Sequence, residues 1–305
     1  MKSPMQRRKF LQTAGVAALG GAGLALTENA AAYQAPTSSP ASPRLLAGCC
    51  AYSYRKYLQH GPMTMEDFIL KGVEMGLNGV DMTAYYFKST DPAYLASLRH
   101  LAFKNGMPFS GVGCGSSMVQ ADKTKRDAML EEIKKWVDAT DALGAPHLRV
   151  FGGKLPSGAT HDQGIQWIVE TMKPACDYAG KKGITLGIED HSGITQSADV
   201  CLDIMHRVDS PYAGINLDIT HFVPSPGQDA YAQIEACIPY ATHTHIREVF
   251  DDHQPIDMDR VWQMFAKAGY KGYMSAEYEG KEDPMTGIPK LIQHIKALDK
   301  NYSSV

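Results

Sequence analysis

Long apolar runs and paired cysteines are both missing from this sequence. The most apolar segment near the N-terminus, residues 13–26, is interrupted by glycine and is shorter than the ~20 apolar residues that a membrane-spanning helix needs. This length disfavours a membrane anchor. The six cysteines form no CxxC pair, and most of them lie within apolar strand or helix patterns. We therefore expect buried free thiols rather than a disulfide framework.

The sequence also lacks an excess of basic charge. It contains 30 lysines and arginines against 33 aspartates and glutamates, and removal of residues 1–32, which hold four of the basic and one of the acidic residues, leaves 26 against 32. Binding to the phosphate backbone depends on lysine and arginine. An acidic chain of this kind argues against nucleic acid as a partner.

The N-terminal residues have the order of an export signal. Arg7 and Arg8 stand before the apolar segment 13–26, and the alanines at 30–32 offer a small-residue cleavage site. The arginine pair followed by a weakly apolar run is typical of the twin-arginine route. We expect residues 1–32 to be a cleaved signal, the mature protein to be periplasmic, and no stable membrane insertion to remain after cleavage.

The rest of the chain alternates short β-rich runs with longer amphipathic runs, eight times over. Residues 33–44 are a Pro/Ser/Ala-rich linker, and the alternation over residues 45–300 predicts a parallel α/β fold. A doubly wound sheet is less favoured, because no GxGxxG follows the first strand. We predict a single (β/α)₈ TIM barrel, whose length of ~250 residues is typical of that fold. The predicted strands are 46–51, 79–82, 109–113, 147–151, 185–190, 213–218, 240–246 and 272–278.

Glycines mark the ends of several predicted helices. In a barrel of this kind, each helix must turn sharply before it enters the next strand, and a glycine permits the left-handed conformation that such a turn uses. We expect this conformation at Gly76, Gly106, Gly144, Gly183 and Gly269.

Four successive predicted strands end in carboxylates or imidazoles. Side chains alternate along a strand, so Glu189, Asp218, His245 and Glu277 can all point into the barrel mouth. Carboxylates crowded in this way repel one another unless a cation neutralises them. This oxygen-rich set predicts one divalent metal ion, Mn²⁺ first, with Mg²⁺, Co²⁺ and Zn²⁺ as alternatives.

These strand ends resemble those of the xylose isomerase-like TIM barrel superfamily, in particular its sugar phosphate isomerase/epimerase branch. The motifs that carry the resemblance are Glu189-Asp190-His191, Asp218-Ile219-Thr220-His221, His245-Ile246-Arg247-Glu248 and Glu277. The resemblance implies that Glu189, Asp218, His245 and Glu277 are the metal ligands and that His221 contacts the substrate. It extends over the chain from about Leu45 to Leu298.

Several positions depart from the pattern of that branch. Asp190 replaces the usual asparagine, Arg247 the commoner lysine, and Glu248 the usual aspartate. The arginine and glutamate that ketose 3-epimerases carry after strands seven and five are missing here. Asp251-Asp252-His253 and Thr195 stand in those neighbourhoods. The metal site is therefore better supported than any particular epimerase activity.

Such a site suits proton removal next to a carbonyl. The metal stabilises the enediolate that forms, and Glu189 and Glu277 can take and return the proton. We predict an isomerase or epimerase acting on a sugar or keto-sugar. His191, His221 and Arg247 are the expected substrate contacts. Arg247 has an internal salt bridge as its alternative role.

Arg149 lies in the fourth predicted strand, where it can reach the mouth and bind substrate or form a buried ion pair. His243 is inward-facing by alternation and is expected to support His245.

Three other functions remain open at this level. A lyase or dehydratase acting on a keto-sugar, a 3-keto-glycoside or an inosose would use the same metal and base. A binding protein would use the mouth without catalysis, although a decayed site should have lost a ligand. An abasic-site endonuclease would need further ligands at the first three strand ends and a basic groove, and the sequence provides neither. The expected partner is a small carbohydrate, and a homo-oligomer is compatible with the sequence.

Overall fold

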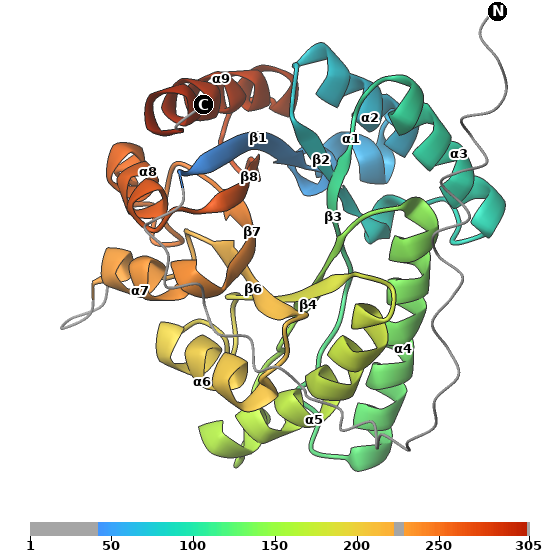
Figure 1. Ribbon diagram of the computed structural model, residues 1–305, viewed down its shortest axis with the longest axis vertical. Coiled ribbons are helices and arrows are strands. Elements are labelled where there is room, and N and C mark those ends of the chain that lie inside the picture. The colour runs from blue at the N-terminus through green and yellow to red at the C-terminus, as the bar shows by residue number, and fades with distance from the viewer. Residues whose placement is uncertain (1–41, 223–228, 304–305) are drawn as a thin grey trace, which may run out of the picture. The chain divides into compact units, whose positions relative to one another are not determined.

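The computed structural model describes residues 42–222 and 229–303. In these residues eight parallel strands close into one barrel in chain order, with β1 pairing with both β2 and β8 (Figure 1). The predicted TIM barrel is confirmed, and each strand agrees with its predicted range to within two residues at either end. The strands are β1 Arg44–Cys50, β2 Gly79–Thr83, β3 Phe109–Gly113, β4 His147–Phe151, β5 Thr185–Glu189, β6 Ala213–Asp218, β7 Ala241–Ile246 and β8 Lys271–Ala276.

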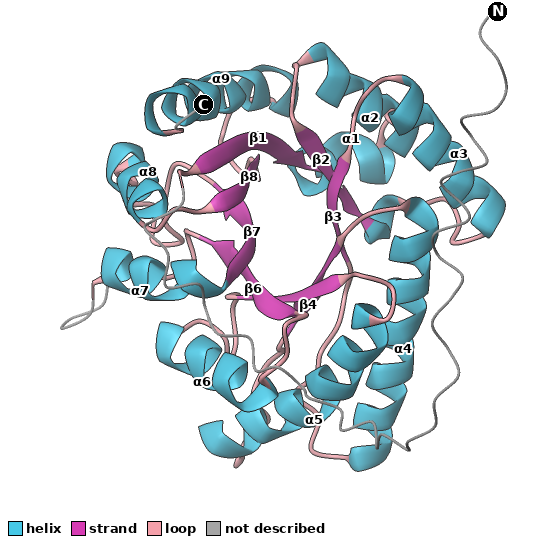
Figure 2. Ribbon diagram, viewed as in Figure 1, coloured by secondary structure: helices cyan, strands magenta, loops and turns pink. Residues whose placement is uncertain are grey.

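Helices surround the barrel on its outer side (Figure 2). They alternate with the strands because each parallel connection must return the chain to the opposite end of the sheet. The α-helices are α1 Arg55–His60, α2 Met65–Glu74, α3 Pro92–Lys104, α4 Lys123–Leu143, α5 His161–Gly180, α6 Ala198–Val208, α7 Ala230–Cys237, α8 Met258–Lys267 and α9 Pro284–Tyr302. Short 3₁₀ turns are η2 Ala51–Tyr54, η3 Ala84–Tyr86 and η4 Ile238–Tyr240. The sequence did not predict α1, which has six residues, all of them exposed or half-buried, and so no apolar period.

The five glycines predicted at helix ends all have the left-handed conformation. Gly144 caps α4 with φ 83°, and its N–H donates to the carbonyl of Thr140. The other four predicted glycines also have positive φ. Such turns direct each strand back into the barrel, so that all strands end at the same face.

The six cysteines all lie within the described residues, and each is a buried free thiol. This confirms the expectation of unpaired cysteines. Among the described residues no helix combines the length and the apolar character needed to span a membrane. The predicted export signal and most of the predicted linker fall in residues 1–41, outside the described part of the chain.

Candidate metal centre and active site

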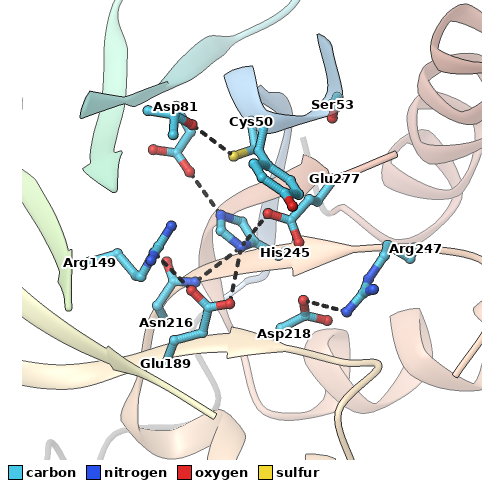
Figure 3. Close-up of polar contacts among 12 residues, drawn as sticks. Cys50, Ser53, Asp81, Arg149, Glu189, Asn216, Asp218, His245, Arg247 and Glu277 are labelled. Atoms are coloured by element: carbon cyan, nitrogen blue, oxygen red, sulfur yellow. Dashed lines mark hydrogen bonds and ion pairs between the residues drawn. The ribbon is translucent and has the colours of Figure 1, made fainter. Parts of the chain in front are cut away.

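The four predicted metal ligands come together at one end of the barrel. Glu189 ends β5, Asp218 ends β6, His245 lies in β7, and Glu277 follows the last residue of β8. The register places Asp218 beside His245. All four side chains are buried, and His245 lies between Glu189 and Glu277 (Figure 3).

The ligand atoms of this set face one another. His245 Nδ1 lies 3.5 Å from Glu277 Oε1 and 3.8 Å from Glu189 Oε1. Glu189, Asp218 and His245 offer ligand atoms that all lie within 4.8 Å of one another. A hard divalent cation binds oxygen ligands at about 2.0–2.6 Å, which requires separations of this size between the donors. Glu189, Asp218 and His245 are therefore a candidate site for a divalent cation, and Glu277 Oε1 lies beside His245 Nδ1 as a further oxygen donor.

The other ring nitrogen of His245 contacts a residue that the sequence analysis missed. His245 Nε2 lies 2.8 Å from Asp81 Oδ2. Burial by itself would raise the pKa of Asp81, but this hydrogen bond and the nearby histidines outweigh burial and lower the pKa to about 2. An ionised carboxylate only accepts, so Nε2–H donates. Cys50 and Asp81 form a second group of donors with His245. Asp81 lies in the middle of β2 rather than at a strand end, and the sequence signal for it is a charged residue inside a buried strand.

His243 packs edge-on against His245 at 5.8 Å, as expected of a supporting residue, while His245 Nε2 donates its hydrogen bond to Asp81. His243 Nε2 lies 3.0 Å from Ser110 Oγ and its ring stacks on His147 at 5.2 Å. Burial lowers the pKa of His147 to about 3 and that of His243 to about 4. Beneath the candidate metal centre, His147 and His243 are therefore neutral at neutral pH, and Asp81 is the charged group beside them.

Arg149 forms a buried ion pair with Glu189. Its Nε lies 2.8 Å from Glu189 Oε2, and the two side chains are 5% and 3% exposed. Burial opposes ionisation of Glu189, but Arg149 outweighs it and lowers the pKa of Glu189 to about 2. Of the two roles considered for Arg149, the ion pair is therefore present, and its side chain also lines the cavity at the mouth.

Arg247 contacts a different set of carboxylates. Its guanidinium lies 3.0 Å from Asp218 Oδ2 and 3.0 Å from Glu279 Oε2. Burial opposes ionisation, but the charges of Arg247 and His221 hold the pKa of Asp218 below its usual range. Arg247 thus forms the internal salt bridge that the sequence allowed as its alternative role.

His221 forms a pair with Asp251 in the loop after β7. Its Nδ1 lies 2.8 Å from Asp251 Oδ2, while Nε2 lies 3.3 Å from Asp218 Oδ2. Burial disfavours the imidazolium, yet the charge of Asp218 and the hydrogen bond to Asp251 raise the pKa of His221 to about 10. A protonated imidazole can donate to a substrate oxygen. In the sequence, Asp251 stands out only as a departure from the epimerase pattern, and its pairing with His221 was not predicted.

Glu277 differs from the other carboxylates. Burial raises the pKa of Glu277 to about 7 despite the opposing charge of His245, and Asp218 and Glu189 add to the rise. A group with a pKa near the working pH exchanges protons most effectively. In the metal-free protein the site therefore holds an ionised carboxylate in Glu189 and a carboxyl in Glu277 whose pKa is raised.

A cavity of about 400 Å³ opens above these residues. It brings together all four predicted substrate contacts and both predicted proton carriers, whereas Asp218 and His245 lie below it and are fully buried. Tyr52 in η2 and Tyr85 in η3, the turns after β1 and β2, add aromatic faces. The lining residues are Tyr52, Tyr85, Arg149, Phe151, Glu189, His191, Ser192, His221, Arg247, Asp251, Glu277 and Glu279.

Residues 70–298 match a family model described as xylose isomerase-like TIM barrel. The chain is 25% identical over 157 residues to the 2-oxo-tetronate isomerase of Haemophilus influenzae, a match that covers 48% of this chain and 60% of that protein. It is 24% identical over 156 residues to the 3-dehydroshikimate dehydratase of Bacillus anthracis, covering 50% of this chain and 52% of that one. The matches thus span between half and three fifths of these relatives.

A solved structure shares the whole barrel. The D-psicose 3-epimerase of Clostridium cellulolyticum H10 superimposes with a TM-score of 0.68 at 15% identity, covering 85% of this chain and 99% of that one. At 15% identity this similarity shows a shared fold and nothing further.

Proposed function

The chain belongs to the xylose isomerase-like TIM barrel family, and from that premise we propose that it is a divalent-metal-dependent isomerase or epimerase of a sugar or keto-sugar. One observation carries the proposal. The donor atoms of Glu189, Asp218 and His245 lie within 4.8 Å of one another, and Glu277 Oε1 lies 3.5 Å from His245 Nδ1, at the base of a cavity lined by groups that can donate and accept protons. A relative that is an isomerase is consistent with this chemistry.

The proposed ligands are Glu189, Asp218, His245 and Glu277, with Mn²⁺ as the first choice of ion. When bound, the ion supplies positive charge against which a substrate hydroxyl and its neighbouring carbonyl can carry developing negative charge. Asp81 holds the His245 ring so that Nδ1 faces this position.

Proton transfer is assigned to Glu189 and Glu277. Arg149 keeps Glu189 ionised, so this carboxylate can accept the proton of a carbon next to a carbonyl. Glu277 lines the cavity, and its carboxyl can return a proton to the substrate. Removal and return of a proton by these carboxylates leaves the atoms of the substrate unchanged in number, as isomerisation and epimerisation require.

Positioning of the substrate is assigned to four side chains around the cavity. His221 and Arg247 are cationic donors for hydroxyl or carbonyl oxygens, and His191 packs edge-on against His221 at 4.6 Å. Arg149 can contact the substrate from the side on which it holds Glu189. Tyr52 and Tyr85 offer aromatic faces to a sugar ring.

A second candidate is a lyase or dehydratase using the same metal centre. The pair of His221 and Asp251 favours it, because an imidazolium at the cavity can protonate a leaving hydroxyl or alkoxide while a carboxylate removes the proton from the neighbouring carbon. The electrons of that C–H bond then form the double bond. A relative that is a dehydratase is consistent with this second candidate.

We further propose that residues 1–32 direct export to the periplasm by the twin-arginine route. Replacement of both Arg7 and Arg8 by lysine should hold the protein in the cytoplasm without changing its folded domain. Fractionation of cells that express the two forms measures this, and an unchanged periplasmic share of the variant would count against the proposal.

The test of activity uses the purified protein with Mn²⁺ in deuterated water. Ketoses, inososes and 3-keto-glucosides are followed by NMR, each with and without a chelator. Deuterium incorporation without loss of water or an aglycone supports the isomerase or epimerase. An unsaturated product or a freed aglycone assigns the site to the lyase. Absence of exchange with every substrate class contradicts both.

A further inference from the structure

A second cavity adjoins the cavity of the metal centre. Its volume is about 510 Å³, and it shares Phe151, His191 and Ser192 with the first cavity of about 400 Å³. It lies over the loops that follow β3, β4 and β5. The residues that line it are Ser116, Ser117, Val119, Gln120, Phe151, Gly153, Lys154, Pro156, His191 and Ser192.

The two cavities differ in chemistry. The first is lined by the carboxylates of Glu189, Asp251, Glu277 and Glu279. Among the described residues that line the second there is no carboxylate, and its polar groups are serine hydroxyls, an amide, His191 and the ammonium of Lys154. The second cavity therefore has groups that bind hydroxyls through hydrogen bonds, together with apolar walls, and is suited to hold a ligand rather than to move its protons.

Hydrogen bonds between neighbouring loops fix the positions of the segments that line the second cavity. Phe151 N donates to Ser116 Oγ at 2.6 Å, which ties the end of β4 to the loop after β3. Val119 N donates to the carbonyl of Gly152 at 2.9 Å. Ile194 N donates to the carbonyl of Gly153 at 3.1 Å, which adds the loop after β5. A binding surface formed in advance loses less conformational entropy when a ligand binds.

Close approach of the loops also depends on Gly153. Its φ is 104°, and a Cβ at this position would collide with Ser117 Oγ. The loops after β3 and β4 therefore meet at a position that only glycine occupies without strain.

The junction of the cavities has an aromatic wall. The rings of Phe151 and His191 lie 4.7 Å apart at 57°, and both face the two cavities. Aromatic and imidazole rings pack against the C–H faces of sugars. A carbohydrate of two sugar rings can therefore lie across this wall with its C–H faces against Phe151 and His191. Since small-molecule sites are typically about 300–1,000 Å³, the first cavity alone suffices for a monosaccharide.

We propose that the second cavity binds the second ring of a two-ring carbohydrate, a glycoside or disaccharide derivative whose first ring lies at the metal centre. This proposal rests on the proposed function for the identity of the reacting ring. The bond between the rings then crosses the wall of Phe151 and His191. Serine, glutamine and lysine side chains of the second cavity contact the hydroxyls of the ring that does not react.

Lys154→Trp tests the proposal, because Lys154 is exposed and lines the second cavity but not the first, so that a bulky indole there occupies space in the second cavity and leaves the residues of the first unchanged. Lys125→Trp, at an exposed position of α4, is the matched control. The substrates are a keto-disaccharide and the keto-monosaccharide of its reacting ring. We expect Lys154→Trp to lower kcat/KM about tenfold for the disaccharide, equal to ~1.4 kcal/mol, and less than about twofold for the monosaccharide. Equal losses for both substrates, or none, overturn the proposal.

A binding measurement separates failure of the subsite from failure of the proposed function. Cellobiose and glucose are titrated into the Mn²⁺-treated protein and followed by saturation-transfer NMR. Tighter binding of cellobiose that Lys154→Trp removes supports the second-ring site even where neither keto-sugar reacts. Equal binding of the two sugars, or cellobiose binding that Lys154→Trp leaves intact, overturns it.

Discussion

His245 Nε2 donates a hydrogen bond to Asp81 Oδ2 at 2.8 Å, and this bond turns the opposite nitrogen of the ring toward Glu189 and Glu277. The two residues are 164 positions apart in the chain. With the proton held on Nε2, the lone pair of Nδ1 is available to a metal ion. Asp81 thus sets the tautomer of His245 without lying among the proposed ligands itself.

Asp81→Asn should weaken metal binding by about 10–100-fold, the usual effect of removing such a supporting carboxylate. The amide keeps the shape of the side chain but removes its charge. Titration of Mn²⁺ followed by electron paramagnetic resonance measures the affinity. Asp127→Asn, on the exposed face of α4, is the control. Unchanged Mn²⁺ affinity in Asp81→Asn would show that this hydrogen bond does not determine which nitrogen of His245 is free to bind the metal.

Asp218 and Asp190 are adjacent buried carboxyl groups, and we expect replacement by asparagine to reduce the metal content at Asp218 but not at Asp190. Asp218→Asn removes a proposed ligand, and we expect the purified variant to contain substoichiometric metal. Burial raises the pKa of Asp190 well above its usual value, which favours the neutral form, and an amide oxygen can still accept the hydrogen bond from Asp218 N. Asp190→Asn should therefore keep its metal. Elemental analysis distinguishes the two, and a full metal content in Asp218→Asn would remove Asp218 from the ligand set.

Glu277→Gln should reduce turnover by about 10²–10⁴-fold, the contribution typical of a general acid or base. The amide cannot exchange a proton with the substrate. Circular dichroism checks that the variant is folded, and NMR in deuterated water measures the exchange. Glu132→Gln, in an exposed ion pair of α4, controls for loss of a carboxylate. Activity at the level of the unchanged protein would exclude Glu277 from proton transfer.

The stability of the metal-free protein should depend on the ionisation of Glu277. Burial raises the pKa of Glu277 from 4.5 to about 7, so its contribution to the free energy of unfolding is present below pH 4.5 and is lost as the pH rises through 7. The loss is roughly 3 kcal/mol. Because glutamine does not titrate, the Tm of Glu277→Gln relative to the unchanged protein should rise between pH 5 and pH 8. Thermal denaturation with a chelator measures this, and a constant Tm difference would contradict the assigned shift.

The barrel was predictable because its signals are local. Each amphipathic helix and each strand is specified by residues within one element, and turns such as that at Gly144 depend on a single residue. The proposed ligands were predictable for the same reason. Strand alternation and the common direction of parallel strands place Glu189, Asp218, His245 and Glu277 at one face, whatever the details of packing.

The partners of those ligands were not predictable in this way. Several carboxylates near the strand ends could pair with either arginine. Arg149 pairs with Glu189 and Arg247 with Asp218 because of distances that only the closed barrel sets. The pairing of His221 with Asp251 depends on the path of a loop, because the two residues lie in the connections after β6 and β7.

The amino-acid sequence by itself determined that this chain forms a barrel with a carboxylate and imidazole set at its mouth, because element type, strand direction and side-chain alternation are local properties. Tertiary structure alone decided that Asp81 supports His245, that Glu277 carries a raised pKa, and that a second cavity joins the first. These features arise from residues that are distant in sequence, and only closure of the barrel fixes the separations and the burial on which they depend.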